Sequence, residues 1–383
     1  MIFKKIIEST VNYIHNLVKW TYQVVFMNKK RKIRKKQWLK LHNLKNLSRR
    51  TKRKNIAHKK RLKSKGIITS SNIYYDRQKQ EYSFVAPKNL SIINNPNETI
   101  TYFNEVLRKI NEKVHYKLTI NFLFNEVEDL SIDSIMYMLA ITKNTKKHHS
   151  SKGSYPIHEE AKAIFMNSGF LKFVRSNQNV INPNPNEDIR IRIKDNSYEN
   201  AKICKEINTI LMEKYSVKRK DLRFLYDMLN EMMINTNEHA YNKKNGLLNN
   251  WYVYIATEKE KIKISFLDTG LGIPNTVSKN FFEKINLLGL KSNTDFILSA
   301  LNGEFMSSTK QAHRGKGLPK FTKYNKAKKI HNFKIISGKG MVWYNENNNG
   351  YCAQNLDKEL VGTVYYFEIN VANLKEERKN VNN

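Results

Sequence analysis

Residues 221–241 read DLRFLYDMLNEMMINTNEHAY. Their apolar side chains recur every three or four positions, which predicts one buried stripe of an amphipathic helix. The stripe consists of Leu222, Leu225, Met228, Leu229, Met232 and Met233. A polar row on the same helix steps by four through Glu231, Asn235 and His239. Such a row can hold a hydrated cation and orient a water, and an ordinary solvated helix face gives the same pattern.

A strand and two glycine pairs follow this helix. Residues 261–267, KIKISFL, alternate and then run apolar, as a half-buried strand does. The strand leads into Asp268-Thr269-Gly270-Leu271-Gly272. An acid before two glycines at a strand end lets backbone approach a flat ligand closely. The second pair, in Arg314-Gly315-Lys316-Gly317-Leu318, offers backbone N–H groups and cations to phosphate, and Gly362-Thr363 opens a last strand over 364–369.

These four motifs, in this order, resemble the GHKL superfamily of ATP-binding domains, found in gyrases, heat-shock chaperones, histidine kinases and mismatch-repair proteins. The helix row is similar to the N box, the glycine pairs to the two glycine boxes, and Gly362-Thr363 to the closing Gly-Thr. The resemblance covers 201–371, and the N-box histidine makes it most similar to the anti-sigma-factor kinase branch. It implies a two-layer α/β sandwich with a mixed sheet and helices on one face.

The resemblance also implies site roles. Asp268 would accept a hydrogen bond from the adenine amine, with Thr363 supporting the base, and Asn235 would ligate Mg²⁺. Glu231 would be the catalytic residue that orients or deprotonates a water or hydroxyl. The other residues implied to contact ATP are His239, Gly270, Gly272, Arg314, Gly315, Lys316, Gly317 and Leu318, the second glycine box closing as part of a lid. For His239 a structural role is an equal alternative.

A second resemblance lies nearer the N-terminus. Residues 127–134 (VEDLSIDS) and 163–170 (AIFMNSGF) resemble the strand-to-helix turn and the last helix of STAS domains, the anti-sigma-factor antagonist fold. The family's phosphoacceptor position falls on Ser134, although a hydroxyl in the first helical turn is the alternative. The glycine that usually follows is absent, and the polar residues 146–155 replace an expected strand. We predict a small α/β domain over 71–180.

Charge marks a third region. Residues 28–65 contain 19 of the 68 Lys and Arg residues and no Asp or Glu, within a chain of net charge +34. A run of this kind repels itself and attracts polyanions. It predicts a nucleic-acid-binding arm, and a solvated basic tail or a segment that binds an acidic partner are the alternatives. The preceding residues 1–27 are too often interrupted by charge to span a membrane and predict an amphipathic helix.

The predicted organisation is a helix (1–27), a basic arm (28–70), a STAS-like domain (71–180), a linker and edge strand (181–199), an ATP-binding domain (200–372) and a disordered tail (373–383). Cys204 and Cys352 imply neither a disulfide framework nor a zinc site, and a reducing cytoplasm fits them. The predicted cofactors are ATP and Mg²⁺. Two uses stay open: an ATPase or Ser/Thr kinase acting on a STAS-like or sigma-factor-type partner, or an ATP-gated binding module. A homodimer is compatible with both.

Overall fold

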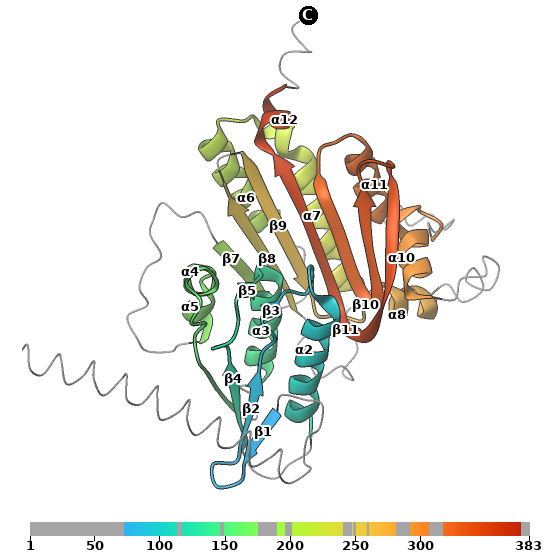
Figure 1. The fold of residues 1–383 in the computed structure, drawn as a ribbon. Coiled ribbons are helices and arrows are strands. Elements are labelled where there is room, and N and C mark those ends of the chain that lie inside the picture. Colours follow the sequence, from blue (N-terminus) through green and yellow to red (C-terminus); the bar gives the residue numbers. More distant parts are fainter. Residues whose placement is uncertain are drawn as a thin grey trace, which may run out of the picture. The chain divides into compact units, whose positions relative to one another are not determined.

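The computed structural model describes the chain between residues 73 and 376 with several gaps (Figure 1). The described residues are 73–112, 117–145, 149–174, 190–195, 201–239, 247, 250–258, 260–280, 292–305 and 317–376. They belong to one compact unit, Asn72–Asn383. The predicted helix over 1–27, the basic arm over 28–70 and most of the linker over 181–199 lie outside them, so these predictions stay predictions.

A small α/β layer forms the first part of the described chain. Its strands are β1 (Ile73–Asp76), β2 (Glu81–Val85), β3 (Asn89–Leu90), β4 (Thr119–Leu123), β5 (Asp129–Leu130) and β6 (Ser150–Gly153). Its helices are α2 (Pro96–Ile110), α3 (Ile132–Thr145), α4 (Glu159–Asn167) and α5 (Phe170–Val174). Strands β2, β4 and β6 pair in parallel, and β1 is antiparallel at the edge. The α/β class predicted for this region is therefore confirmed.

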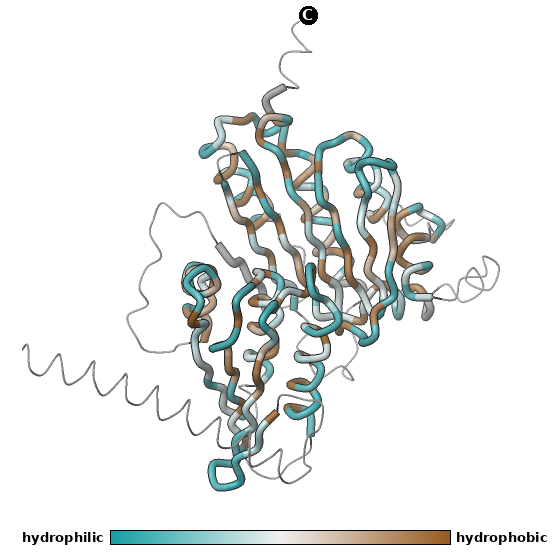
Figure 2. Tube along the Cα trace, viewed as in Figure 1, coloured by the Kyte–Doolittle hydropathy of each residue, from teal (hydrophilic) through white to brown (hydrophobic). Residues whose placement is uncertain are grey.

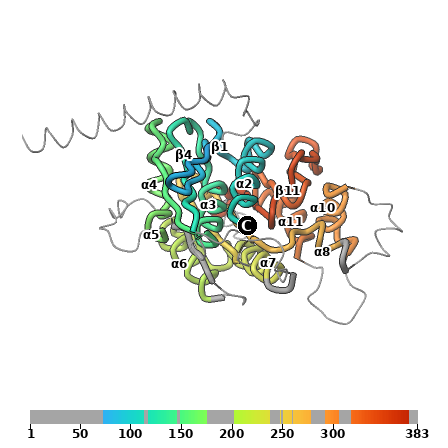
Figure 3. The backbone as a smooth tube through the Cα atoms, turned by 90° about the horizontal axis from the view of Figure 1, so that it is seen from below, coloured from blue at the N-terminus to red at the C-terminus, as the bar shows by residue number. Residues whose placement is uncertain are grey.

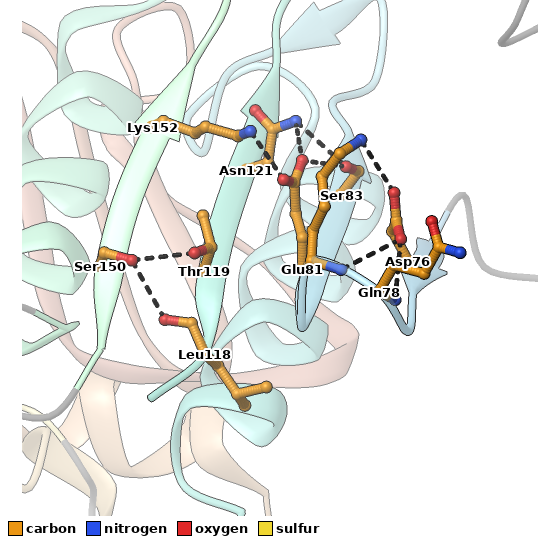
Figure 4. Close-up of polar contacts among 10 residues, drawn as sticks. Asp76, Gln78, Glu81, Ser83, Leu118, Thr119, Asn121, Ser150 and Lys152 are labelled. Atoms are coloured by element: carbon orange, nitrogen blue, oxygen red, sulfur yellow. Dashed lines mark hydrogen bonds and ion pairs between the residues drawn. The ribbon is translucent and has the colours of Figure 1, made fainter. Parts of the chain in front are cut away.

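One face of the four-stranded sheet is polar (Figure 4). Lys152 Nζ lies 2.6 Å from Glu81 Oε2, and Asn121 Nδ2 donates to Glu81 Oε1 at 2.8 Å. The alternating residues Ile120 and Phe122 face the other way and are buried with α2 and α3. Strand β6 contributes to the polar face, which explains why residues 146–155 give no apolar strand pattern. The prediction that this segment lacks a strand is therefore wrong.

Five antiparallel strands form the larger sheet, in the order β10-β11-β9-β8-β7. They are β7 (Arg190–Asp195), β8 (Asn250–Thr257), β9 (Lys261–Asp268), β10 (His331–Asn345) and β11 (Gly350–Asn370). The strands predicted over 261–267 and 364–369 lie in this sheet, and β7 lies within the segment predicted as a linker and edge strand (181–199). It is antiparallel throughout and not mixed as predicted. Strands β9 and β10 run in the same direction, but β11 lies between them and pairs antiparallel with both.

Helices cover one face of this sheet. They are α6 (Ala201–Tyr215), α7 (Arg223–His239), α10 (Asn293–Leu301) and α11 (Leu318–Lys326), and their buried residues share a core with Phe266 and Phe367 of the strands. A 3₁₀ helix, η1 (Arg219–Leu222), precedes α7, and α8 (Ile273–Asn280) follows β9. The final helix, α12 (Val371–Glu376), includes the first residues of the segment predicted to be a disordered tail.

The opposite face of the larger sheet is also covered, which differs from the predicted sandwich with helices on one face only. Tyr252, Tyr254, Leu267 and Val364 point to this face and share one core with α2 and α3. Figure 3 shows α2 and α3 on one side of the sheet and α6 and α7 on the other. Hydrophobic residues run along these strands, whereas the β1–β2 turn is hydrophilic (Figure 2). A sheet whose strands are apolar on both faces needs two covering layers.

The first layer also contacts one segment of β11 by hydrogen bonds. A register shift in the β10–β11 hairpin loops residues 356–359 out of the ladder. Asn104 Nδ2 in α2 donates to the carbonyl oxygen of Glu359 at 2.8 Å. Tyr137 Oη in α3 donates to the carbonyl oxygen of Val361 at 3.3 Å. Helices α2 and α3 therefore hold the chain immediately before the predicted Gly-Thr motif.

Candidate functional site

Helix α7 places the predicted polar row beside the sheet. The predicted apolar stripe is confirmed, because all six of its side chains are buried in the core of the larger sheet. Asp221 accepts a hydrogen bond from the Lys218 N–H at 2.9 Å just before the helix. With the rotation of α7 fixed in this way, Glu231 is only 8% exposed and Asn235 is half-buried. His239 ends the helix, and its side chain lies outside the described ones.

Three polar residues meet at the ends of adjacent strands on the face that α7 covers. Asp268 of β9 is in register with Thr363 of β11, which is in register with Ser337 of β10. The Ser337 and Thr363 hydroxyls are 3.0 Å apart, and all three residues are buried. Asp268 and Thr363 were predicted to share a ligand from positions far apart in the sequence, and the structure brings them together. Ser337 is a third member that no local sequence pattern indicates.

Asp268 carries an unusual carboxyl group. Burial raises the pKa of Asp268 from its ordinary value to about 6, whereas hydrogen bonds from Gly270 and Thr363 lower it. The Gly270 N–H donates to Asp268 Oδ1 at 2.9 Å. Desolvation is the larger effect. A buried carboxyl with a raised pKa beside two glycines is typical of a site that receives a polar ligand.

Two glycines with positive φ allow three backbone segments to meet around Asp268. Gly272 has φ +78°, and a Cβ there would lie 2.8 Å from Ser337 Oγ. Gly362 has φ +98°, and a Cβ there would overlap the carbonyl oxygen of Asp268. Other residues would be strained at both positions. Ser337 Oγ also accepts from the Ile273 N–H at 2.8 Å, which joins the first glycine pair to β10.

The beginning of α11 lies against Glu231. Gly317 precedes this helix with ordinary helical angles, φ −80° and ψ −53°, so its backbone does not require glycine. A Cβ at Gly317 would instead overlap the Glu231 carboxyl group. One turn into the helix, Lys320 Nζ lies 3.0 Å from Glu231 Oε2. Leu318 is half-buried beside them. The predicted N box and the predicted second glycine box therefore contact each other directly.

Tyr365 connects the strand-end residues with Glu231. It lies two residues beyond Thr363 on the same face of β11, and its ring stacks on Phe321 of α11 with 5.6 Å between centroids. The pKa of Tyr365 is raised well above its ordinary value, first by burial and then by the negative charges of Asp268 and Glu231. Both carboxyl groups therefore affect the pKa of one buried phenol.

Asn235, one helical turn beyond Glu231, has a polar atom without a partner among the described residues. Its buried Nδ2 has no hydrogen-bond partner among the residues that the structure describes. An unpaired buried amide is costly, and the assignment of its oxygen and nitrogen depends on the partner it receives. In the same part of the chain, no three or more His, Cys, Asp or Glu residues gather as metal ligands. Mg²⁺ bound with a nucleotide needs only one or two protein oxygens, and Asn235 would supply one through Oδ1, not through the unpaired Nδ2.

Three predicted site residues are not among those that the structure describes. Arg314, Gly315 and Lys316 are outside the described residues, so their contact with phosphate stays a prediction. Lys320, Ser337 and Tyr365 are not among the predicted site residues. Only Lys320 could have been found from the local sequence, because it lies one helical turn after Gly317. Ser337 and Tyr365 acquire their places through strand pairing, which single-sequence patterns do not determine.

Ser134 is not placed for phosphorylation. It is fully buried in the first turn of α3, where its hydroxyl accepts from the Ile92 N–H at 3.0 Å. The same hydroxyl donates to Asp133 Oδ2 at 3.4 Å. Burial excludes a kinase from this hydroxyl in the folded protein. The alternative interpretation, a structural hydroxyl in the first helical turn, is therefore the one that the structure favours.

No protein-family model matches the chain, and no curated protein matches it either. Within its described part, the chain has no helix with the length and apolar character that crossing a membrane requires. The geometry of the site is therefore what supports a function.

Proposed function

We propose that this chain binds Mg-ATP as members of the GHKL superfamily do. The observation that supports this proposal is the convergence of four motifs that are widely separated in the sequence. Gly272 and Gly362 pack around Asp268, which is in register with Thr363. Gly317 packs on Glu231, one turn before Asn235 on α7. The four motifs thus contact each other in two pairs, and motifs that matched by chance would have no reason to pair in this way.

Each described residue has a suitable chemical role. The Asp268 carboxylate would accept from the exocyclic amine of adenine, and a hydrogen bond to a charged acceptor is stronger than a neutral one. Asn235 would hold Mg²⁺, which when bound neutralises phosphate charge. Glu231 would orient or deprotonate an attacking water or hydroxyl. The start of α11, after Gly317, would lie near the phosphates, where a helix N-terminus favours negative charge.

The finer classification is part of the same proposal. The larger sheet with α6, α7, α10 and α11 would be the GHKL sandwich, and the small α/β layer over 73–174 would be the STAS-like domain. A family member of the anti-sigma type would phosphorylate a hydroxyl on a STAS-like partner, whereas an ATPase would transfer the phosphoryl group to water. Both reactions use the Glu231 and Asn235 positions. In a third use, ATP sets the conformation of a binding module without being consumed.

Nucleotide titration of the full chain tests the binding proposal. Guanine presents a carbonyl where adenine presents its amine, so Asp268 would face another acceptor. An unpaired buried polar group costs about 1–3 kcal/mol, and more when it is charged like Asp268, so ATP should bind at least about tenfold more tightly than GTP. Equal affinity for the two nucleotides, or none for either, would contradict the proposal. Incubation with γ-labelled ATP, alone and with cell lysate, then separates transfer to protein from release of phosphate.

The basic arm favours a second function that is compatible with the first. Residues 28–65 hold 19 Lys and Arg residues without a single Asp or Glu, which suits a DNA or RNA backbone. Binding should then weaken with salt by a log-log slope of about −0.9 for each DNA phosphate neutralised. Deletion of the arm should remove most of this slope and leave ATP affinity intact. If DNA or RNA binding does not depend on salt, or is absent at low salt, the proposed nucleic-acid function is wrong.

A further inference from the structure

An ion pair joins α11 to Glu231, the residue that we propose orients or deprotonates the attacking group. Lys320 Nζ and Glu231 Oε2 are 3.0 Å apart, although 89 residues separate them in the sequence. The Glu231 side chain is 11% exposed, whereas that of Lys320 is 39% exposed. The carboxylate is therefore fixed in the protein, and the ammonium group lies at the boundary with solvent. A lysine is a compact charge on a flexible stem, so it can exchange partners without moving the helix.

The surroundings of Glu231 make this pair relevant to the nucleotide. Gly317 closes over the other side of the Glu231 carboxyl group, where even a Cβ would overlap it. With Lys320 on Oε2 and Gly317 beside Oε1, the carboxylate is enclosed by the first turn of α11. In this arrangement it is not free to orient an attacking group. Something must draw Lys320 away before Glu231 can act.

We propose that Lys320 is the residue by which this site distinguishes a nucleoside triphosphate from a diphosphate. In the structure it pairs with Glu231, and it would transfer to the terminal phosphate when a triphosphate binds. This inference rests on the proposed nucleotide site. A terminal phosphate carries more charge and more acceptor oxygens than a carboxylate, so it competes successfully for one ammonium group. The same exchange frees Glu231 at the moment when the terminal phosphate is in place.

The test compares Mg-ADP with the Mg complex of a non-hydrolysable ATP analogue, adenylyl imidodiphosphate, by calorimetric titration of the full chain. Lys320→Met should weaken binding of the analogue by about 10-fold to 100-fold, the range for one hydrogen bond to a charged group. Its affinity for ADP should change less than about threefold. Lys320→Arg should retain most of the preference for the analogue. Lys323→Met, an exposed lysine on the same helix, is the matched control and should change neither affinity.

Glu231→Gln gives a second, opposite expectation. Removal of its charge removes the competitor for Lys320, so analogue binding should tighten several-fold. The gain should vanish in the Lys320→Met/Glu231→Gln double variant, which also leaves no unpaired charge and so remains foldable if Lys320→Met alone is unstable. An unchanged ratio of analogue to ADP affinity in the variants lacking Lys320, or weaker analogue binding in Glu231→Gln, would overturn the role of Lys320. If the wild type binds neither nucleotide, the proposed function itself fails.

Discussion

Substitution of Asp268 by Asn should stabilise the protein while it impairs nucleotide binding. Asn has the same shape and can still accept from the Gly270 N–H, which lies 2.9 Å from Asp268 Oδ1. It lacks the charge that burial disfavours. It also presents an NH₂ group in place of one carboxylate oxygen. One of the donors Gly270 and Thr363 then loses its acceptor at every pH, so the pH dependence alone reports the charge, and a donor would face the adenine amine. Stability and binding should therefore move in opposite directions.

The size and sign of the stability change follow from the pKa. Burial raises the pKa of Asp268 from 3.8 to about 6 in the folded protein. Below pH 3.8 the carboxyl is protonated in both states and has no effect, and its ionisation destabilises the fold increasingly as pH rises toward 6. Above pH 6 the full cost is about 3 kcal/mol, because each pKa unit corresponds to about 1.4 kcal/mol. At pH 4.5 the cost is about 1 kcal/mol.

The assay is urea unfolding of wild type and Asp268→Asn without nucleotide, at pH 8 and at pH 4.5. The gain in free energy of unfolding should be about 2 kcal/mol larger at pH 8. Asp357→Asn, an exposed carboxylate, is the control and should show no such difference. A gain that is the same at both pH values, or larger at pH 4.5, would refute the reasoning. ATP titration at pH 8 should show the accompanying loss of affinity.

Two further substitutions and one labelling experiment test other contacts. Gly317→Ala should destabilise the fold by about 1–3 kcal/mol in thermal unfolding, because the new Cβ overlaps Glu231; Gly350→Ala, which has room, is its control. Ser337→Ala should cost about 1–3 kcal/mol and weaken ATP binding, because it leaves a backbone N–H without its acceptor. Ser134 should acquire no label from γ-labelled ATP in the folded protein, and labelling there would show that α3 opens.

Local patterns predicted those parts of the fold that depend on one segment at a time. The apolar stripe on α7 and the alternation of polar and apolar residues over 261–267 each indicate which side of one element is buried. The structure confirms both elements. Strand β6 escaped prediction because its residues line a polar sheet face. The sequence also did not predict that α2 and α3 cover the larger sheet. An apolar strand face indicates burial but not which element buries it.

In the candidate site, too, the sequence predicts contacts within one element but not those that depend on strand pairing. Glu231 and Asn235 are one helical turn apart, so their proximity could be predicted from spacing. That Asp268 lies beside Thr363 could be predicted only from the family resemblance. That Ser337 lies beside Thr363 follows only from the strand register. Gly317 was predicted because glycine suits a phosphate loop, and the structure supplies another reason, the contact with Glu231.

The shared core between the first α/β layer and the larger sheet changes how the site must be studied. Residues 200–372 were predicted as the ATP-binding domain, yet Tyr252, Leu267 and Val364 of this range are fully buried against α2 and α3. Expression of 200–372 alone would expose this apolar face to water, which favours aggregation. It would also remove the hydrogen bond from Tyr137 to Val361, next to the turn that holds Thr363. If the isolated fragment fails to bind ATP, the missing α/β layer is a sufficient explanation. The proposed site is therefore tested only with the full chain.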